Sequence, residues 1–269
     1  MCQRVGPCHK ENPRTLIFSQ LREVFPFSEV FYRGNLQTNK FETQGMKMPE
    51  KNDWTKEELK RKYIATRTAI TIPVNMQIKG QQRIFDLTET KKILKSAEVI
   101  ALCECGCRTR LKKCNSPIDV CIALDKPAKD KIKRGLARKA SLEQAFEALE
   151  RSHKAGLVHM AYVYKGNEKP DYICSCCSCC CHSLSALVRF GMPEAVGHVV
   201  ASKYIAVNNP ETCISCGTCV ERCQFKARHL ENNELVFNET RCFGCGVCVS
   251  TCPTKSISMV TRKPNMGKS

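Results

Sequence analysis

The sequence predicts an α+β fold in which a mostly helical, cysteine-rich domain precedes a small module with further cysteines at the C-terminus. Two four-cysteine runs with identical spacing lie near the C-terminus, and eleven more cysteines lie between Cys103 and Cys181. Patterns typical of helices and of strands both occur around them. With 269 residues, the chain is long enough to bury a core outside the C-terminal module.

Composition and spacing divide the chain into four segments. Residues 1–55 form an N-terminal extension of unknown role, whose two cysteines are expected to be free thiols. Residues 56–203 form the cysteine-rich domain, which we expect to bind metal. Residues 204–262 form the C-terminal module, and residues 263–269 form a tail.

Helices are predicted at four places in the cysteine-rich domain. The clearest follows Ser141, where Gln144 completes a capping box, and it ends at Gly156, a residue type that commonly closes a helix. The other three are expected over residues 56–66, 88–98 and 183–190.

Strands are predicted from short apolar or alternating runs. In the cysteine-rich domain a strand is expected at residues 157–164, a strand or an extended packing segment at residues 69–78, and a short buried run at residues 99–102. In the C-terminal module, residues 204–207 and 256–259 should pair with each other. Residues 235–237 should form a hairpin with the segment before them.

The two C-terminal runs give the strongest chemical signal. Both have separations of two, two and three residues, and they comprise Cys213, Cys216, Cys219 and Cys223, then Cys242, Cys245, Cys248 and Cys252. In the bacterial pattern of iron–sulfur ligation, the fourth cysteine of each run binds the other cluster. We therefore expect one cluster on Cys213, Cys216, Cys219 and Cys252, and the other on Cys242, Cys245, Cys248 and Cys223. The alternative is a zinc site, which would favour two pairs of Cys or His ligands separated by a longer spacer. Two matched four-cysteine runs fit that pattern poorly.

At these residues the chain resembles the bacterial-type dicluster ferredoxin module, over about residues 204–262. One departure is Gln224, which stands where a proline often follows the fourth cysteine, whereas Pro253 keeps that proline in the second run. The resemblance implies a ferredoxin-type fold, two 4Fe–4S clusters and the transfer of single electrons.

The cysteines of the middle domain predict a further metal centre. The candidate ligands are Cys103, Cys105, Cys114, Cys121, Cys174, Cys176, Cys177, Cys179, Cys180 and Cys181. Thiolates select iron–sulfur clusters or zinc, so the centre is either a third iron–sulfur cluster or a structural zinc ion. We favour iron–sulfur, because a chain that receives two clusters meets the machinery that loads them. The sequence leaves open which cysteines bind.

The middle domain also resembles part of a known group of proteins. The matching stretches are Val99–Cys121, Gly156–His159 and Ile173–Cys181. They are similar to cytoplasmic iron–sulfur proteins of anaerobic bacteria and archaea, an uncharacterised family in which a cysteine-rich domain precedes a dicluster ferredoxin tail. Cys107 stands outside this pattern as an addition. The resemblance implies electron transport.

Charge and hydropathy bear on partners and location. The formal net charge is +17, and residues 125–139 carry a basic run that is expected to be a solvated loop followed by the start of a helix. A basic surface favours a redox partner with an acidic docking face. No apolar run approaches the ~20 residues that span a bilayer, and the first thirty residues lack the apolar core of a signal peptide. We expect a cytoplasmic protein, because thiolates persist there.

These observations favour an iron–sulfur electron-transfer protein that passes single electrons through two or three 4Fe–4S clusters to a redox partner. The alternative is an oxidoreductase with an active-site cluster in the cysteine-rich domain, although the chain has no phosphate-binding loop and no flavin or nicotinamide motif. A redox-sensing regulator that binds nucleic acid is a third hypothesis, which no recognition-helix pattern supports. No catalytic residue is predicted.

Overall fold

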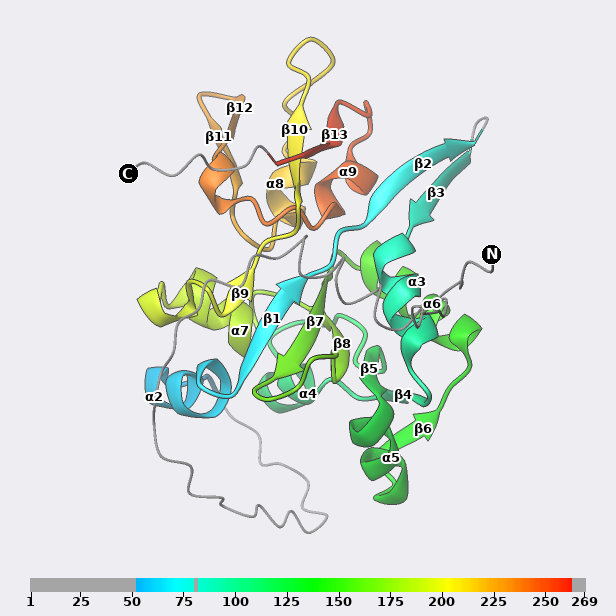
Figure 1. The fold of residues 1–269 in the computed structure, drawn as a ribbon. Coiled ribbons are helices and arrows are strands. Elements are labelled where there is room, and N and C mark those ends of the chain that lie inside the picture. The colour runs from blue at the N-terminus through cyan, green and yellow to red at the C-terminus, as the bar shows by residue number, and fades with distance from the viewer. Residues whose placement is uncertain (1–51, 80–81, 263–269) are drawn as a thin grey trace, which may run out of the picture. The chain divides into compact units, whose positions relative to one another are not determined.

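A seven-stranded sheet organises the cysteine-rich domain (Figure 1). The computed structural model describes residues 52–79 and 82–262, all within the unit Gly45–Ser269. The strand order is β6-β4-β5-β8-β7-β1-β9, and only the pair β1–β9 is parallel. The strands are β1 (Arg67–Thr71), β4 (Ile100–Cys103), β5 (Cys121–Leu124), β6 (Ala137–Lys139), β7 (Val158–Tyr164), β8 (Tyr172–Cys176) and β9 (Val199–Val200).

Helices pack around this sheet. They are α2 (Lys56–Glu58) with η1 (Leu59–Ile64), α3 (Thr88–Ser96), α4 (Gly106–Leu111), α5 (Asp125–Lys133), α6 (Leu142–Lys154), α7 (His182–Leu184) with η2 (Ser185–Arg189), and η3 (Pro193–Ala195). The capping box predicted for α6 is present: Gln144 N–H donates to Ser141 Oγ at 3.2 Å, and Ser141 N–H donates to Gln144 Oε1 at 3.1 Å. The buried side of α6 packs against β4, β7 and β8.

The two faces of the sheet differ in chemistry because successive side chains of a strand point in opposite directions. Leu102 on β4 and Ile122 on β5 lie in the main apolar core, together with residues of α6. Cys103 and Cys121, each one residue away, pair across the two strands and pack together in a separate cluster. Strand β8 adds two further cysteines to this second face, Cys174 and Cys176.

The C-terminal module consists of two similar halves. Its strands are β10 (Tyr204–Asn208) paired with β13 (Ile257–Thr261), and β11 (Arg228–Glu231) paired with β12 (Glu234–Phe237). Its helices are α8 (Thr218–Arg222), η4 (Glu239–Arg241) and α9 (Val247–Thr251). Residues with a left-handed backbone recur at matching places in the two halves: Ser215 and Gly244, Gly217 and Gly246, and Lys226 and Lys255.

The structure confirms the α+β class and corrects one part of the prediction. The cysteine-rich domain is organised by a sheet, so the expectation of a mostly helical domain is wrong in its architecture. Strands β4, β5 and β8 are short and largely buried, and each contains cysteine, so the sequence shows little alternation there. The strand expected at 69–78 divides into β1 and β2 (Asn75–Lys79), and β2 pairs with the unpredicted β3 (Gln82–Asp86).

Two further predictions meet different outcomes. The basic run at 125–139, expected to begin as a loop, forms α5 and β6. Nearly all of the N-terminal extension, with both of its cysteines, and the tail lie outside the described residues. Within the part of the chain that is described, no helix combines the length and the apolar character needed to cross a bilayer.

The contact between the module and the sheet domain can be tested at Gly246. The backbone N–H of Val74 donates to Cys245 O at 3.1 Å, and a Cβ on Gly246 would stand 1.7 Å from Val74 O. Because the obstacle is backbone, Gly246→Ala must displace the Val74 segment. We expect a marked fall in the apparent melting temperature of the anaerobic protein, measured by circular dichroism.

The matched control is Gly217→Ala in the other half of the module. Gly217 has φ +75°, close to the +81° of Gly246, but the nearest atom to an added Cβ is a flexible leucine methyl group at 3.3 Å. In the control, the free energy of unfolding should fall only by the about 1–2 kcal/mol that a left-handed backbone costs an alanine. Equal losses of melting temperature in the two variants would contradict the close contact at Val74.

Candidate metal centres

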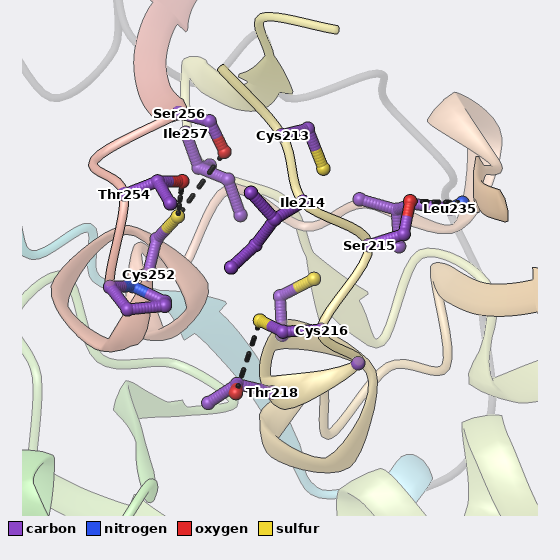
Figure 2. A pocket seen from close by; sticks show the side chains of 13 residues that line it. Cys213, Ile214, Ser215, Cys216, Thr218, Leu235, Cys252, Thr254, Ser256 and Ile257 are labelled. Carbon is purple, nitrogen blue, oxygen red and sulfur yellow. Dashed lines mark hydrogen bonds between the residues drawn. The ribbon is translucent and has the colours of Figure 1, made fainter. Parts of the chain in front are cut away.

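Four cysteines of the module line one pocket. Cys213, Cys216 and Cys219 come from the first run, and Cys252 comes from the second. Figure 2 shows Cys213, Cys216 and Cys252 on different sides of the pocket, with the side chain of Ile214 in the space among them. Cys216 is exposed, so this group of thiols opens towards solvent.

Hydroxyl groups contact two of these sulfur atoms (Figure 2). Thr218 Oγ1 lies 3.4 Å from Cys216 Sγ, and hydrogen bonding to Thr218 lowers the pKa of Cys216. Ser256 Oγ lies 3.2 Å from Cys252 Sγ. Burial raises the pKa of Cys252, but its hydrogen bonds with Ser256 and Thr254 outweigh this and lower the pKa overall. These contacts favour the thiolate form, which is the form that binds metal.

The other four cysteines of the module form a more buried group. Burial raises the pKa of Cys245 well above its ordinary value, and the neighbouring thiolates of Cys248, Cys223 and Cys242 raise it further. Cys223 comes from the first run, so each group takes three cysteines from one run and one from the other. Thiols that oppose one another's ionisation are stabilised as thiolates when a cationic metal core lies between them. Both groups fit that requirement.

One buried arginine lies near both groups. Arg228 is 2% exposed, and its charge lowers the pKa of Cys219 in one group and of Cys248 in the other, against the opposing effect of burial. The guanidinium is held in place by hydrogen bonds to Ala206 O at 2.7 Å and to Asn208 Oδ1 at 3.3 Å. It supplies a fixed positive charge inside the module.

Comparison with known families bears on this same region. Residues 205–253 match the family model of the 4Fe-4S dicluster domain. The match includes all eight cysteines of the two runs and supports iron–sulfur clusters near the C-terminus of the chain. A comparison with curated proteins finds no match.

A second pocket lies on the cysteine face of the sheet. It has a volume of about 270 Å³, and seven cysteines line it: Cys103, Cys105, Cys107, Cys121, Cys174, Cys176 and Cys181. We call them the pocket thiols. Cys105 is hydrogen-bonded to Cys107 and Cys121, and Cys181 is hydrogen-bonded to Cys107 and Cys176. Cys174 is hydrogen-bonded to Cys121, and Cys103 packs with Cys105 and Cys121, so the pocket thiols adjoin one another.

Cys107 is the member of this group that the sequence pattern left out. It lies in the first turn of α4, which the sequence analysis did not predict. Its spacing of two residues from Cys105 was the available signal. The other six pocket thiols are among the ten candidate ligands that the sequence predicted for the middle domain.

Aromatic and basic side chains form another part of the pocket wall. The Arg67 guanidinium stacks over the rings of Tyr164 at 4.3 Å and Tyr63 at 5.1 Å. Tyr63 in turn stacks on His182, with 4.0 Å between the ring centroids. Burial lowers the pKa of His182 to about 4, so this histidine is neutral near pH 7.

The remaining four cysteines of the domain form a tighter group, which we call the four-thiol site. The Sγ atoms of Cys114, Cys177, Cys179 and Cys180 all lie within 4.8 Å of one another. Cys114 follows α4, and the other three occupy the turn between β8 and α7. None of the cysteines in the described residues forms a disulfide.

Arg108 lies between the pocket thiols and the four-thiol site. It is 2% exposed, and it donates from Nε to Pro117 O at 3.0 Å and from Nη1 to Ser175 O at 2.8 Å. Nη1 also lies 3.9 Å from Cys177 Sγ. Hydrogen bonds from neighbouring thiols, together with the Arg108 charge, lower the pKa of Cys105 to about 3. The arginine therefore supports thiolates on both sides.

Gln224 connects the module to the cysteine-rich domain. Its Oε1 accepts hydrogen bonds from the backbone N–H and the hydroxyl of Ser178, at 2.8 and 2.9 Å. Its Nε2 donates to Gly156 O at 3.1 Å. A proline at this position could make none of these bonds, so the departure from the ferredoxin pattern has a structural role.

The charge of Arg228 leads to a prediction about reduction potential. Reduction adds negative charge to a cluster, and a nearby positive charge stabilises the reduced form. Arg228→Gln should therefore lower the potentials of both module clusters, by on the order of 50–100 mV, in a redox titration followed by electron paramagnetic resonance (EPR). Arg241→Gln, at an exposed arginine of the same module, should change them far less. Unchanged potentials in Arg228→Gln would contradict the assigned electrostatic role.

Proposed function

We propose that the protein transfers single electrons by means of two 4Fe–4S clusters in its C-terminal module. One cluster is bound by Cys213, Cys216, Cys219 and Cys252, and the other by Cys242, Cys245, Cys248 and Cys223. Each cluster gains or loses one electron when bound. The family match at residues 205–253 and the two groups of four thiols support this proposal.

The two groups suit different tasks. The group with the exposed Cys216 opens to solvent and suits exchange of electrons with another protein. The group with Cys245 is more buried and contacts the sheet domain through the Val74–Cys245 hydrogen bond. The chain therefore presents one group to a partner and the other to its own cysteine-rich domain.

The observation that carries the proposal further is an apolar core shared by the module and the pocket thiols. Cys223 and Cys245 pack against this core, and Cys176 and Cys181 belong to it. Phe225 and Val247 fill the space with them and exclude water. We therefore propose a third iron–sulfur centre on the pocket thiols, in electronic contact with the module.

The proposed partner is a redox protein with an acidic face. Helix α5 and strand β6 expose basic side chains, among them Lys126, Lys133, Arg138 and Lys139. Attraction between exposed charges weakens as salt rises, so association with such a partner should be salt-sensitive. The many free thiols favour a reducing cytoplasm as the place of action.

A second candidate is a reductase whose active site is the pocket itself. The favouring observation is that seven thiols line a space of about 270 Å³, three more than one cubane cluster needs. Arg67 and Lys131 also line it, so a small anionic substrate would match its charge. The experiment below distinguishes a redox-active pocket from a redox-inactive one.

Electronic contact between the module and the pocket can be tested with Cys245→Ser. After rapid mixing with a reduced viologen and freezing, EPR of the wild type should show reduction of the pocket centre together with the module clusters. In Cys245→Ser, reduction of the pocket centre should slow at least about tenfold, because the cluster nearest the shared core is lost or converted.

The control is Cys2→Ser, at a cysteine outside the described residues, which should leave both the iron content and the kinetics unchanged. If the pocket centre of Cys245→Ser is reduced at the wild-type rate, it does not receive its electrons through the module. Absence of any signal beyond the two module clusters would restrict the function to the ferredoxin-type module.

A further inference from the structure

We infer that the four-thiol site, Cys114, Cys177, Cys179 and Cys180, binds a single zinc ion as a closed tetrahedral site, separate from the iron–sulfur centres. This inference does not depend on the proposed function. It divides the cysteines of the middle domain between two kinds of metal centre, where the sequence analysis expected one.

The sulfur–sulfur distances carry the inference. Cys114 Sγ lies 3.8 Å from Cys177 Sγ, and Cys179 Sγ lies 3.8 Å from Cys180 Sγ. Four sulfur ligands at about 2.3 Å from a tetrahedral zinc ion are separated from one another by about 3.8 Å. In a cubane cluster each thiolate binds a different iron, so the sulfur atoms stand farther apart. The observed spacing is that of one ion.

The peptide groups around the site are fixed by hydrogen bonds. Trp54 Nε1 donates to Cys180 O at 2.8 Å, and Arg189 Nη1 donates to Cys179 O at 3.0 Å. Within the turn, Cys181 N–H donates to Cys177 O at 3.0 Å. Such outer contacts orient the ligands of a metal site, so little reorganisation is needed when the ion binds.

The charges near the site suit four thiolates around a divalent ion, which together carry a net charge of about −2. The buried Arg108 lies against Cys177. Lys113 directly precedes Cys114, and Asp53 joins it to Arg189 through ion pairs with both. The cations stay beside the site because the carboxylate of Asp53 anchors them.

All four ligands come from the protein, which is typical of structural rather than catalytic zinc. The ion would tie the segment after α4 to the turn between β8 and α7. That turn directly follows Cys174 and Cys176 and directly precedes Cys181, so the ion would fix the positions of three pocket thiols. Ser178, inside the same turn, is also the residue that Gln224 of the module binds.

The test compares the metal content of anaerobically purified full-length proteins. The wild type should contain about one zinc per chain, and X-ray absorption at the zinc edge should show four sulfur neighbours at about 2.3 Å. Cys114→Ser should lose most of the zinc while keeping the about eight iron atoms of the two module clusters. Cys107→Ser, which removes a pocket thiol on the neighbouring helix α4, should keep the zinc.

The variant Cys114→His covers the case in which Cys114→Ser fails to fold, because imidazole is also a zinc ligand. It should retain zinc and show three sulfur neighbours and one nitrogen neighbour. A zinc content in Cys114→Ser equal to that of the wild type would overturn the inference. So would a single tetrahedral iron in place of zinc, or a thiol count showing that these cysteines are oxidised to disulfides.

Discussion

The end of strand β8 at Cys176 is the constraint on which the two proposed metal sites of the middle domain depend. Up to that residue, alternation of side chains directs Cys174 and Cys176 to one face of the sheet. After it, the chain turns and directs Cys177, Cys179 and Cys180 to a different place. A single short string of cysteines can therefore serve two sites, because the backbone changes direction within it.

The opposite face of the sheet explains why the pocket thiols stay in place. There Leu102, Ile122 and Ile173 pack beneath α6 in an apolar core. Burying this face fixes the register of β4, β5 and β8, since a slip by one residue would bring cysteines into the core and expose its apolar residues. The packing that stabilises the domain is therefore also what aligns Cys103 with Cys121.

The module is attached to this domain by specific contacts and not only by the chain between them. Gln224 joins it to Ser178 and Gly156, and Cys245 accepts a hydrogen bond from Val74. Each of these contacts lies within one residue of a proposed ligand or at the ligand itself. Binding of the proposed clusters and packing of the two parts would therefore depend on each other, which suits the proposed transfer of electrons across that boundary.

The sequence predicted those features whose causes are local. The capping box at Ser141 predicted α6, and the repeated spacing of the two C-terminal runs identified the region that matches the dicluster domain. Ligation by those eight cysteines remains a prediction. The seven-stranded sheet and the division of the middle cysteines could not be predicted, because they depend on pairing between strands distant in sequence. Cys107 was missed although its spacing from Cys105 pointed to it, whereas its contact with Cys181 arises only in the folded chain.

Mössbauer spectroscopy tests most directly whether the middle cysteines are divided between an iron–sulfur centre and a zinc site. The full-length protein is purified anaerobically from cells grown on isotopically enriched iron. We expect more iron than the about eight atoms of two cubane clusters, all of it in sulfide-bridged environments and none as an isolated tetrahedral ion. Iron limited to the two module clusters, or an isolated tetrahedral iron, would contradict the proposed division of the thiols.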